Sequence, residues 1–513
     1  MLFNSYIFLL IFLPLALGIY HALVHRNFRV SLGWLTASSL FFYAWWNPAA
    51  GQPWTPFYLF LLIGSAYGNF LFGRAIEGTA SPGLRKAWLH SGVAGNLGLI
   101  AYFKYRGLFS ELQHWNSGDA AQVVEVAMPL AISFYTFIQI AYLVDVSRGG
   151  VPRYSFSKYL LFVVFFPHLI AGPIVHHSEL IPQFKKPRRS RLWRNLAIGG
   201  TLLVIGLFKK VVIADALARG ATPLFELVAS GARPLSFVEA WVAALSYTTQ
   251  LYFDFSGYSD MAIGLSFMFG IRLPLNFDSP YKATSVVDFW KRWHITLSRF
   301  LRDYLYIPLG GNRKGSARRY INLLLTMLLG GLWHGAGISY ILWGLIHGVF
   351  ICINHFWFGL REKLGIPKMP RVLAIALTFF IVVLAWVPFR AGSFELQGGQ
   401  FGISMEVTGS IYASMFGMNG FEGWPDGGTA IVKSSRIFRA LGVALLVIWL
   451  MPNSQRWMGT YSPHLGQRVR KLGYMFHWMR WRPTVAWLAI TLGLLYAVGS
   501  ELDKVSEFIY YQF

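Results

Sequence analysis

Three stretches of the sequence place ionisable side chains among strongly apolar neighbours. They are residues 250–260, which include Asp254; residues 288–303, which include His294; and the pair Trp333 and His334. Ionisable groups in apolar surroundings are costly and usually mark a transport path or a reaction site. Because histidine and aspartate side chains exchange protons, the three stretches are candidates for acid–base chemistry.

Glycines surround His334 in the sequence. Four of them lie within four residues of it: Gly330, Gly331, Gly335 and Gly337. Glycine lets backbone and ligand come close to the imidazole. A helix from Tyr320 rises about 21 Å by His334, which is less than a hydrocarbon core of about 30 Å. We therefore expect His334 deep in a membrane at a glycine-rich turn, with a packed, hydrogen-bonded core histidine as the structural alternative.

The other two stretches also allow structural interpretations. The first joins two apolar segments, so Asp254 or Ser256 could cap a helix at an interfacial turn. The second, taken as a continuous helix, places its tryptophans on one side and most of its basic residues elsewhere. That pattern predicts an amphipathic helix at the cytoplasmic interface. It leaves open whether His294 faces solvent or the protein interior.

Other catalytic and metal-binding patterns find little support. His168, His176 and His177 with Glu179 could be drawn as a metal site, but their spacing is not compact, so we expect no metal. The single cysteine, Cys352, excludes an intramolecular disulfide and a thiolate cluster within the chain. The sequence contains no Gly-x-Ser-x-Gly elbow and no phosphate-binding glycine-rich loop with lysine.

The composition indicates a membrane protein. Of the 513 residues, 55% are hydrophobic, which exceeds what one soluble core of that length requires. Apolar runs of bilayer-spanning size, or nearly so, occur at residues 5–24, 56–72, 126–144, 372–386 and 485–498. We predict one all-α integral membrane domain over residues 1–513, with about ten or eleven spans. No basic residue precedes the first apolar run, so we expect a permanent span that starts outside.

Basic residues orient the predicted spans. The net charge of +23 comes from lysines and arginines in short loops between apolar segments, a pattern typical of cytoplasmic loops rather than of nucleic-acid binding. Basic loops near residues 185–194, 313–319 and 468–482 should therefore lie inside. Residues 107–147 and 391–432 contain no lysine or arginine, so their polar loops should lie outside.

Two apolar segments have basic residues at both ends, which does not fit a simple span. The first, residues 159–175, contains Pro167, Gly172 and Pro173. Helix breakers at membrane depth are tolerated where the broken backbone is buried in protein or lines a wet cavity. We predict a re-entrant hairpin there, with a plain span as the alternative. The same reasoning applies to residues 321–354, whose middle contains His334.

Long ordered motifs give the sequence a family resemblance. The runs are QLYFDFSGYSDMAIGLSFMFGIRLPLNFDSPY (residues 250–281), DFWKRWHITLSRFLRDYLYIPLGGNR (288–313) and LLGGLWHGAGISYILWGLIHG (328–348). They closely resemble the bacterial membrane-bound O-acyltransferases, most of all the alginate O-acetylation subunit. Relatives in cellulose acetylation, peptidoglycan O-acetylation and lipoteichoic acid D-alanylation are similar too. FFYAWW (41–46), SFYTFIQIAYLVDV (133–146), FFPHLIAGPI (165–174) and the C-terminal YYQF also fit, whereas residues 391–432 do not align.

The resemblance implies an architecture and two central histidines. The fold would be a ring of about ten or eleven transmembrane helices, with re-entrant and interfacial helices, that encloses a tunnel. The acyltransferase core would lie near residues 126–355, with peripheral helices in residues 1–125 and 372–513. His334 matches the family's catalytic histidine, and His294 matches its second characteristic position. We expect His334 to act as general base and His294 to position the donor or stabilise charge at the thioester.

The resemblance also suggests supporting residues. Four would support the site or line the tunnel: Gln250, Asp254, Asp260 and Trp333. Either aspartate could fix an imidazole tautomer. Three arginines would meet the donor's phosphates at its cytoplasmic entry, unless they are ordinary positive-inside charges: Arg299, Arg302 and Arg313.

The implied activity is O-acetyl transfer across a bacterial cytoplasmic (inner) membrane. Acetyl-coenzyme A would be the donor substrate, with no permanently bound cofactor, and an exported or cell-surface polysaccharide of the alginate or cellulose type the final acceptor. Expected partners are an extracytoplasmic SGNH- or GDSL-like acetyltransferase or other periplasmic acetylation protein, a polysaccharide synthase or export complex, and membrane lipid. Alternatives are peptidoglycan O-acetylation, teichoic acid D-alanylation with a carrier-protein donor, and a transporter of acyl groups or lipids.

Overall fold

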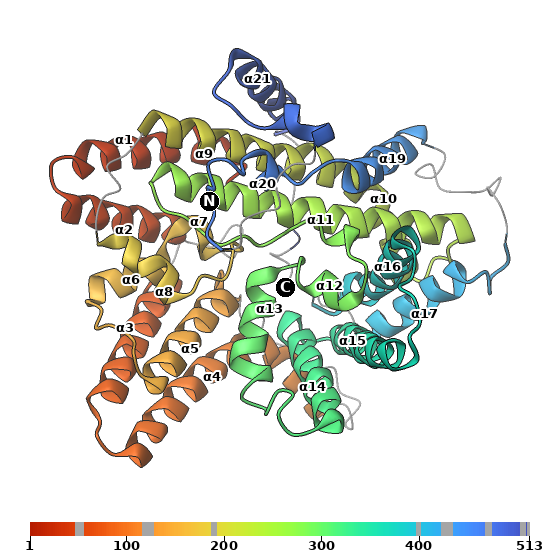
Figure 1. Ribbon diagram of the computed structural model, residues 1–513, viewed down its shortest axis with the longest axis horizontal. Helices are drawn as coiled ribbons and strands as arrows, with labels where there is room; N and C mark the ends of the chain where they lie inside the picture. Colours follow the sequence, from red (N-terminus) through yellow and green to blue (C-terminus); the bar gives the residue numbers. More distant parts are fainter. Residues whose placement is uncertain are drawn as a thin grey trace.

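The computed structural model describes residues 1–46, 56–114, 128–185, 192–396, 402–421, 434–466, 474–502 and 509. Within these ranges the regular structure is helical and no β-strand occurs, so the all-α prediction is confirmed for them. Figure 1 shows the longer helices arranged around two short central ones, α12 (Val286–Trp290) and α13 (Ile295–Leu301).

The N-terminal part of the chain forms one side of this arrangement. Its elements are η1 (Ile7–Phe12), α1 (Leu13–Val24), α2 (Phe28–Ala44), α3 (Phe57–Gly78), α4 (Pro82–His114) and α5 (Ile132–Arg148). Asn27 starts α2 because its side chain accepts hydrogen bonds from the backbone N–H groups of Arg29 and Val30. In Figure 1, α3, α4 and α5 lie together on the left of the centre.

A re-entrant hairpin follows α5. It consists of α6 (Phe156–Val164), α7 (Phe166–Leu169) and an extended return segment. The nine residues of α6 rise only about 14 Å, too little to cross a bilayer. The Tyr154 hydroxyl lies 3.2 Å from Nδ1 of His177, so both ends of the segment are on the same side. The structure confirms the predicted hairpin, and α8 (His177–Leu180) and η2 (Ile181–Phe184) continue from it.

A continuous helical rod crosses the molecule beside the longest central helix. The rod is α9 (Leu192–Leu207), the π-helical turn η3 (Phe208–Ala214) and α10 (Asp215–Ala229), and its neighbour is α11 (Phe237–Met268). Ser236 and Glu239 form a capping box that starts α11. The π-helical turn carries Lys209 and Lys210, both of which reach carboxylates of α11. A π-helical turn is a common sign of a functional or strained position.

The prediction of one continuous amphipathic helix over residues 288–303 is wrong. The chain forms α12, then breaks at residues 291–294, and continues as α13 and the π-helical turn η5 (Arg302–Tyr306). The break falls on His294, whose φ of 42° and ψ of 53° are left-handed. Trp290 and Trp293 are buried within the protein instead of lying at a membrane surface. The short helix η4 (Pro280–Lys282) precedes this region.

His334 lies at the tip of a second hairpin, formed by α14 (Ser316–His334) and α15 (Ile338–Leu364). At the opposite end of the hairpin, the thiol of Cys352 lies 3.7 Å from the carbonyl oxygen of Tyr320. The chain therefore returns to the side from which it came. This confirms a hairpin over residues 321–354, although α15 is itself long and apolar enough to cross a membrane.

The C-terminal part completes the arrangement. Its elements are α16 (Arg371–Leu396), α17 (Ile403–Met415), α19 (Ser435–Leu450), α20 (Ser454–Trp457), η6 (Tyr474–Met479) and α21 (Val485–Gly499). Several sequence predictions fall outside the described residues, wholly or in part: the outer loops within 107–147 and 391–432, the terminal YYQF, and the basic residues Lys186, Arg188, Arg189, Arg191, Arg468, Arg470 and Lys471.

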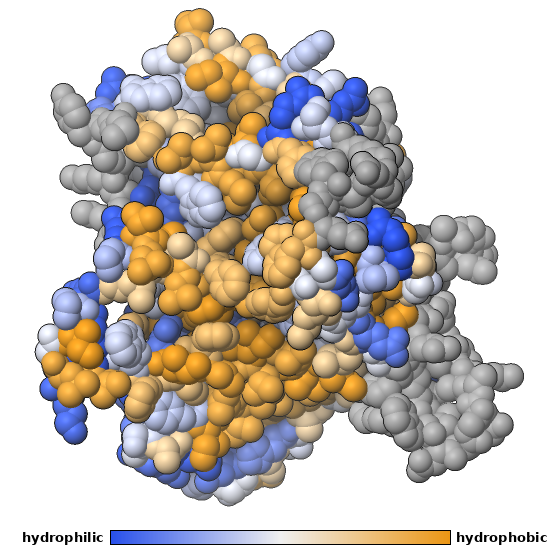
Figure 2. Space-filling model, turned by 90° about the vertical axis from the view of Figure 1, so that its right-hand side faces the viewer, coloured by the Kyte–Doolittle hydropathy of each residue, from blue (hydrophilic) through white to orange (hydrophobic). Residues whose placement is uncertain are grey.

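The outer surface suits a lipid bilayer. On α15 the exposed large apolar residues recur every three or four positions and form one stripe: Ile338, Ile341, Leu345, Val349, Ile353 and Phe356. Figure 2 shows hydrophobic residues over the middle of one face and hydrophilic residues along its lower edge. A soluble protein rarely exposes an apolar area that broad.

Five described helical segments are long and apolar enough to cross a membrane: Ile7–Val24, Phe57–Gly78, Leu192–Ala229, Ile338–Leu364 and Arg371–Phe394. That is fewer than the ten or eleven spans predicted. Four others, α2, α5, α19 and α21, have only 15 to 17 residues. The long helices α4 and α11 carry charged side chains along their length.

Candidate active site

His334 is enclosed by aromatic rings. It ends α14 and is 4% exposed. Its ring meets those of Trp333, Trp343 and Phe389 edge-on, at centroid distances of 4.7, 5.0 and 5.0 Å. Surroundings of this kind keep water away from the imidazole and strengthen any electrostatic interaction that it makes.

Glycines allow the close packing at the tip of the hairpin. A Cβ atom on Gly331 would lie 2.2 Å from the carbonyl oxygen of Tyr340, and one on Gly335 would lie 2.2 Å from the Tyr340 ring. Any larger residue would force α14 and α15 apart. A turn that contains glycine follows His334 as predicted, but Gly330 and Gly331 lie within α14, and the space at Gly331 and Gly335 accommodates Tyr340.

Two side chains of α4 hold the end of the helix that carries His334. The ammonium group of Lys104 donates a hydrogen bond to the carbonyl oxygen of Trp333, and the hydroxyl of Tyr105 donates one to that of Leu332. The last carbonyls of a helix lack intrahelical partners and carry partial negative charge, so a cation there is stabilising. Sequence reasoning missed Lys104 and Tyr105, because nothing local connects residues about 230 positions apart.

His294 is the second buried histidine of the site. It is 1% exposed, and its ring meets that of Phe255 edge-on at 4.7 Å. A left-handed backbone at a bulky residue costs energy and is concentrated at functional sites. The question left open by the sequence is settled, because His294 faces the protein interior.

Asn276 fixes the tautomer of His294. The backbone N–H of Thr296 donates to the side-chain oxygen of Asn276 at 3.3 Å, and the Thr296 hydroxyl does so at 2.9 Å. The same oxygen lies 3.2 Å from Nδ1 of His294. Because an amide oxygen only accepts, Nδ1 must carry the proton. Nε2 of neutral His294 is then a lone pair, and it has no hydrogen-bond partner among the described residues.

This tautomer limits what neutral His294 can do. A lone pair at Nε2 can accept a hydrogen bond or a proton, but it cannot donate to an oxygen that becomes negative. Of the two roles expected from the sequence, positioning therefore fits better than stabilising charge. Asn276 was missed because it stands in a loop eighteen residues before His294 and belongs to no local pattern.

Replacing Asn276 by alanine should lower activity, because the substitution removes the hydrogen bond that orients the His294 ring. The imidazole would lose the acceptor that orients it, and its two tautomers would compete. Loss of such a supporting hydrogen bond typically costs about 10- to 100-fold, and we expect that fall in kcat for acyl transfer by purified protein. The conservative variant Asn276→Gln should recover part of the loss. If Asn276→Ala is folded and has wild-type kcat, the assigned tautomer plays no part in turnover.

The aspartates of α11 bind lysines instead of an imidazole. Asp254 pairs with Lys210 at 2.7 Å, and Asp260 pairs with Lys209 at 2.6 Å. Asp260 also accepts hydrogen bonds from Ser454 and Gln455 at 2.6 Å each. The suggestion that either aspartate fixes an imidazole tautomer is therefore not supported by these contacts, and at His294 Asn276 does so. The alternative in which Asp254 or Ser256 caps a helix is also wrong, since both lie within α11.

Gln250 and Trp333, the other two supporting residues expected from the sequence, are both buried. Gln250 is buried one helical turn before Asp254 on α11, and its side-chain oxygen has no hydrogen-bond partner in the part of the chain that the structure describes. Trp333 stacks on Phe137 at a centroid distance of 4.9 Å, and the ammonium group of Lys104 lies 5.7 Å from its ring centre. Trp333 thus ties the tip of the hairpin to α5 and α4.

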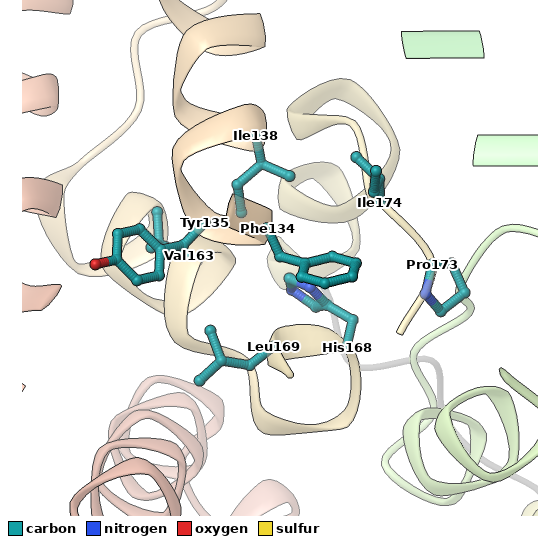
Figure 3. A pocket seen from close by; sticks show the side chains of 8 residues that line it. All are labelled: Phe134, Tyr135, Ile138, Val163, His168, Leu169, Pro173 and Ile174. Carbon is teal, nitrogen blue, oxygen red and sulfur yellow. The ribbon is translucent and has the colours of Figure 1, made fainter. Parts of the chain in front are cut away.

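A small cavity lies beside this site, between α5 and the re-entrant hairpin. Figure 3 shows the side chains around it: Phe134, Tyr135, Ile138, Val163, His168, Leu169, Pro173 and Ile174. Phe134 also meets the ring of Trp333 at 6.0 Å. The backbone N–H of Ile174 donates to the Thr296 hydroxyl at 3.0 Å. Single contacts therefore connect the cavity to the residues next to His334 and His294.

The three arginines differ in their availability. Arg299 forms a two-point ion pair with Glu179, at 2.6 and 2.9 Å, so its guanidinium is already engaged. Arg302 pairs with its neighbour Asp303, but 62% of its side chain remains exposed. Arg313 is exposed in the turn that precedes α14. Arg302 and Arg313 are therefore the more accessible cations for an approaching phosphate.

A histidine cluster near Arg299 resembles a metal site but is better explained by hydrogen bonds. One oxygen of Asp145 lies 2.6 Å from Nε2 of His176, 3.1 Å from Nε2 of His177 and 2.7 Å from the Tyr304 hydroxyl. Nδ1 of His176 accepts from the backbone N–H of Ser178, so the proton of the neutral ring is on Nε2. A metal would need a lone pair there.

The charge of Asp145 agrees with the hydrogen-bonded interpretation. Burial raises the pKa of its carboxyl, but hydrogen bonds from His176, His177 and Tyr304 outweigh that effect and hold the pKa below its ordinary value. The ionised carboxylate accepts from all three groups. The other two residues that the sequence grouped with these histidines have different partners. His168 is hydrogen-bonded to the carbonyl oxygen of Phe162, and Glu179 pairs with the guanidinium of Arg299.

Known proteins match large parts of this chain. The model of MBOAT, the membrane-bound O-acyltransferase family, matches residues 147–390. A peptidoglycan O-acetyltransferase of Helicobacter pylori is 44% identical over 423 residues, which cover 77% of this chain and 78% of the relative. A probable alginate O-acetylase of Pseudomonas aeruginosa is 42% identical over 426 residues, which cover 81% of this chain and 75% of the relative. A teichoic acid D-alanyltransferase of Streptococcus thermophilus is 27% identical over 282 residues, which cover 51% of this chain and 68% of the relative.

Proposed function

This chain belongs to the membrane-bound O-acyltransferase family, and from that premise we propose the donor, the acceptor and the route of its acetyl transfer. It is a multi-pass membrane O-acetyltransferase. The donor is acetyl-coenzyme A on the cytoplasmic side. The final acceptor is a hydroxyl of an exported or cell-surface polysaccharide, and the protein works in the cytoplasmic membrane of a bacterium.

His334 is the general base of this proposal, and its placement is the observation that carries it. The imidazole is held at the tip of a glycine-packed hairpin, inside an aromatic enclosure. A hydroxyl that attacks a thioester must lose its proton as the new bond forms, and an imidazole is suited to accept it. The carbonyl carbon gains a C–O bond and loses its C–S bond. The proton passes from His334 to the departing thiolate.

His294 supports the same step as an acceptor. Its lone pair at Nε2 can hold the attacking hydroxyl, or a donor N–H group of the coenzyme, in the right position. Such positioning raises the rate because the reacting atoms no longer have to find each other. The tautomer that Asn276 imposes supports this role.

The basic surface near α13 supports a cytoplasmic donor. Arg302 and Arg313 are exposed, and Arg299 stands one helical turn before Arg302, held by Glu179. Guanidinium groups bind phosphates at two points, so these residues would meet the diphosphate of coenzyme A. The domain division expected from the sequence, with a core at residues 126–355, remains part of this proposal.

We infer an extracytoplasmic partner of the SGNH or GDSL type, which takes the acetyl group on a serine and passes it to polymer. A polysaccharide synthase or export complex would stand beside it. The alginate O-acetylase relatives favour an alginate- or cellulose-type polymer. Peptidoglycan is the second candidate, because the peptidoglycan O-acetyltransferase relative is 44% identical over most of both chains. D-alanylation has the more distant relatives.

Acetyl transfer by purified protein in lipid vesicles tests this proposal. Labelled acetyl-coenzyme A is supplied outside, and alginate oligomers, cello-oligomers or peptidoglycan fragments are enclosed inside with a candidate serine partner. We expect covalent label on one class of acceptor, and none when free acetate replaces the thioester. A D-alanyl carrier protein serves as the competing donor. Label that crosses the membrane without becoming covalently attached to any acceptor indicates a transporter and contradicts the proposal.

A further inference from the structure

The site contains a third buried histidine, which lies in the aromatic enclosure around His334. His347 is 0% exposed and lies one helical turn after Trp343, on the same buried face of α15. The Trp343 ring meets His334 and His347 at centroid distances of 5.0 Å each. Trp343 and His347 therefore belong to the surroundings of the base, and neither takes part in the general-base step.

Trp290 fixes the tautomer of His347. Its indole N–H points at Nδ1 of His347, at 3.3 Å. An indole nitrogen can only donate, so Nδ1 accepts and the proton of the neutral ring is on Nε2. The opposite side of the imidazole thus presents an N–H donor, directed away from α12. This is the reverse of His294, whose Nε2 presents a lone pair.

Two buried donors on α15 have no acceptor among the described residues. They are Nε2 of His347 and Nε1 of Trp343, and both side chains are at most 1% exposed. Buried polar groups are nearly always hydrogen-bonded, and each exception requires an explanation. The surrounding rings, among them Trp386 and Phe389, offer only weak contacts to an N–H group.

An oxygen that becomes negative during acyl transfer would satisfy both donors. Resting on the proposed function, we propose that the imidazole N–H of His347 and the indole N–H of Trp343 form the oxyanion hole of this enzyme. Donors already fixed in a dry site stabilise developing charge more than water does, because they need not reorient. Trp343 contacts both His334 and His347, so in this proposal the acyl carbonyl lies between the base and the two donors.

The chemical step then uses each group once. The hydroxyl oxygen bonds to the carbonyl carbon while His334 takes the hydroxyl proton, and the carbonyl π electrons move to the oxygen held by His347 and Trp343. When that oxygen re-forms its double bond, the C–S bond breaks. The thiolate leaves with the proton from His334. No electron or proton is left over, and no further reactant is needed.

Paired substitutions at His347 test the oxyanion hole. His347→Phe keeps a ring in the aromatic box but removes the donor, and His347→Gln puts an amide N–H near the position of Nε2. Removing one such donor costs at least about 100-fold in rate, so we expect that fall in kcat for His347→Phe, with a donor KM within about threefold of wild type. His347→Gln should retain more activity than His347→Phe. His347→Gln can also accept from the Trp290 indole, which His347→Phe cannot, so the order of these two variants is read together with Trp343→Phe, which leaves that hydrogen bond in place.

Trp343→Phe gives an independent measurement should His347→Phe not fold. It keeps the aromatic packing, removes the indole N–H and should also lower kcat by about 100-fold. Trp457→Phe is the matched control, because its indole N–H is likewise buried without a partner in the described part of the chain. Trp457 packs on Trp487, outside the enclosure, so its variant should keep wild-type kcat.

The outcomes separate this inference from the function on which it rests. If wild-type protein transfers no acetyl group in the vesicle assay, the proposed function fails. If wild-type protein transfers acetyl and either folded variant, His347→Phe or Trp343→Phe, keeps wild-type kcat, the oxyanion hole is overturned while the proposed function stands. Folding is checked for every variant by size-exclusion profile and thermal unfolding in detergent.

Discussion

His334→Ala should lower kcat/KM for acetyl transfer by about 10³- to 10⁴-fold. General base catalysis contributes up to about that factor, and the rings of Trp343 and Phe389 that contact His334 offer no other base. The measurement is transfer of labelled acetyl groups by purified protein in vesicles, at donor concentrations that separate kcat from KM. We expect most of the loss in kcat, because the base acts in the transition state and not in donor binding.

A matched histidine on the same hairpin controls for this substitution. His355 lies on α15 towards the open end of the hairpin, is only partly buried, and stands outside the aromatic enclosure. His355→Ala should keep activity within about twofold, as is usual for substitutions away from a functional site. A folded, membrane-inserted His334→Ala protein that still transfers acetyl groups at the wild-type rate would show that another group is the base.

The two re-entrant hairpins could be predicted because membrane physics acts on local sequence. Basic residues at both ends of one apolar segment argue against a simple span, and proline or glycine at its middle permits a turn. The position of His334 at the turn of a hairpin was predicted in the same way, from its glycines and its distance from Tyr320. The contacts between Tyr154 and His177, and between Cys352 and Tyr320, confirm both hairpins.

The hydrogen bonds that set the tautomers of His294 and His347 could not be predicted, because they come from residues distant in the sequence. Asn276 and Trp290 reach His294 and His347 across 18 and 57 positions. Residues 288–303 have the composition of a helix, yet His294 adopts a left-handed backbone because tertiary contacts with Asn276 outweigh local propensity. The pattern of a single sequence reveals neither these distant hydrogen-bond partners nor the left-handed backbone at His294.

The carboxylates of α11 illustrate the same limit. Asp254 and Asp260 stand out in the sequence as charges among apolar residues, but their lysine partners are 44 and 51 positions away. Carboxylates near a histidine are a reasonable prediction for tautomer control. In the structure they instead neutralise two adjacent lysines of a π-helical turn, so that four charges can lie inside the membrane domain in pairs.

Lys210→Met should strongly destabilise the protein. The substitution leaves Asp254, which is 1% exposed, with only the backbone N–H of Ile509, at 3.4 Å, among the contacts seen in the described residues. Removing one partner of a buried ion pair costs roughly 3–5 kcal/mol, because the remaining charge is uncompensated. We expect a large loss of folded protein on size exclusion and a markedly lower unfolding midpoint in detergent.

Three further variants show whether an uncompensated charge is the cause. Asp254→Asn should cost less, because Lys210 keeps its second partner Asp215 at 2.9 Å. Lys210→Met combined with Asp254→Asn should recover much of the loss, since no buried charge is then left unpaired. Lys209→Met should be milder than Lys210→Met, because Asp260 retains hydrogen bonds from Ser454 and Gln455. If Lys209→Met and Lys210→Met destabilise equally, the effect comes from the π-helical turn itself and not from the charge of Asp254.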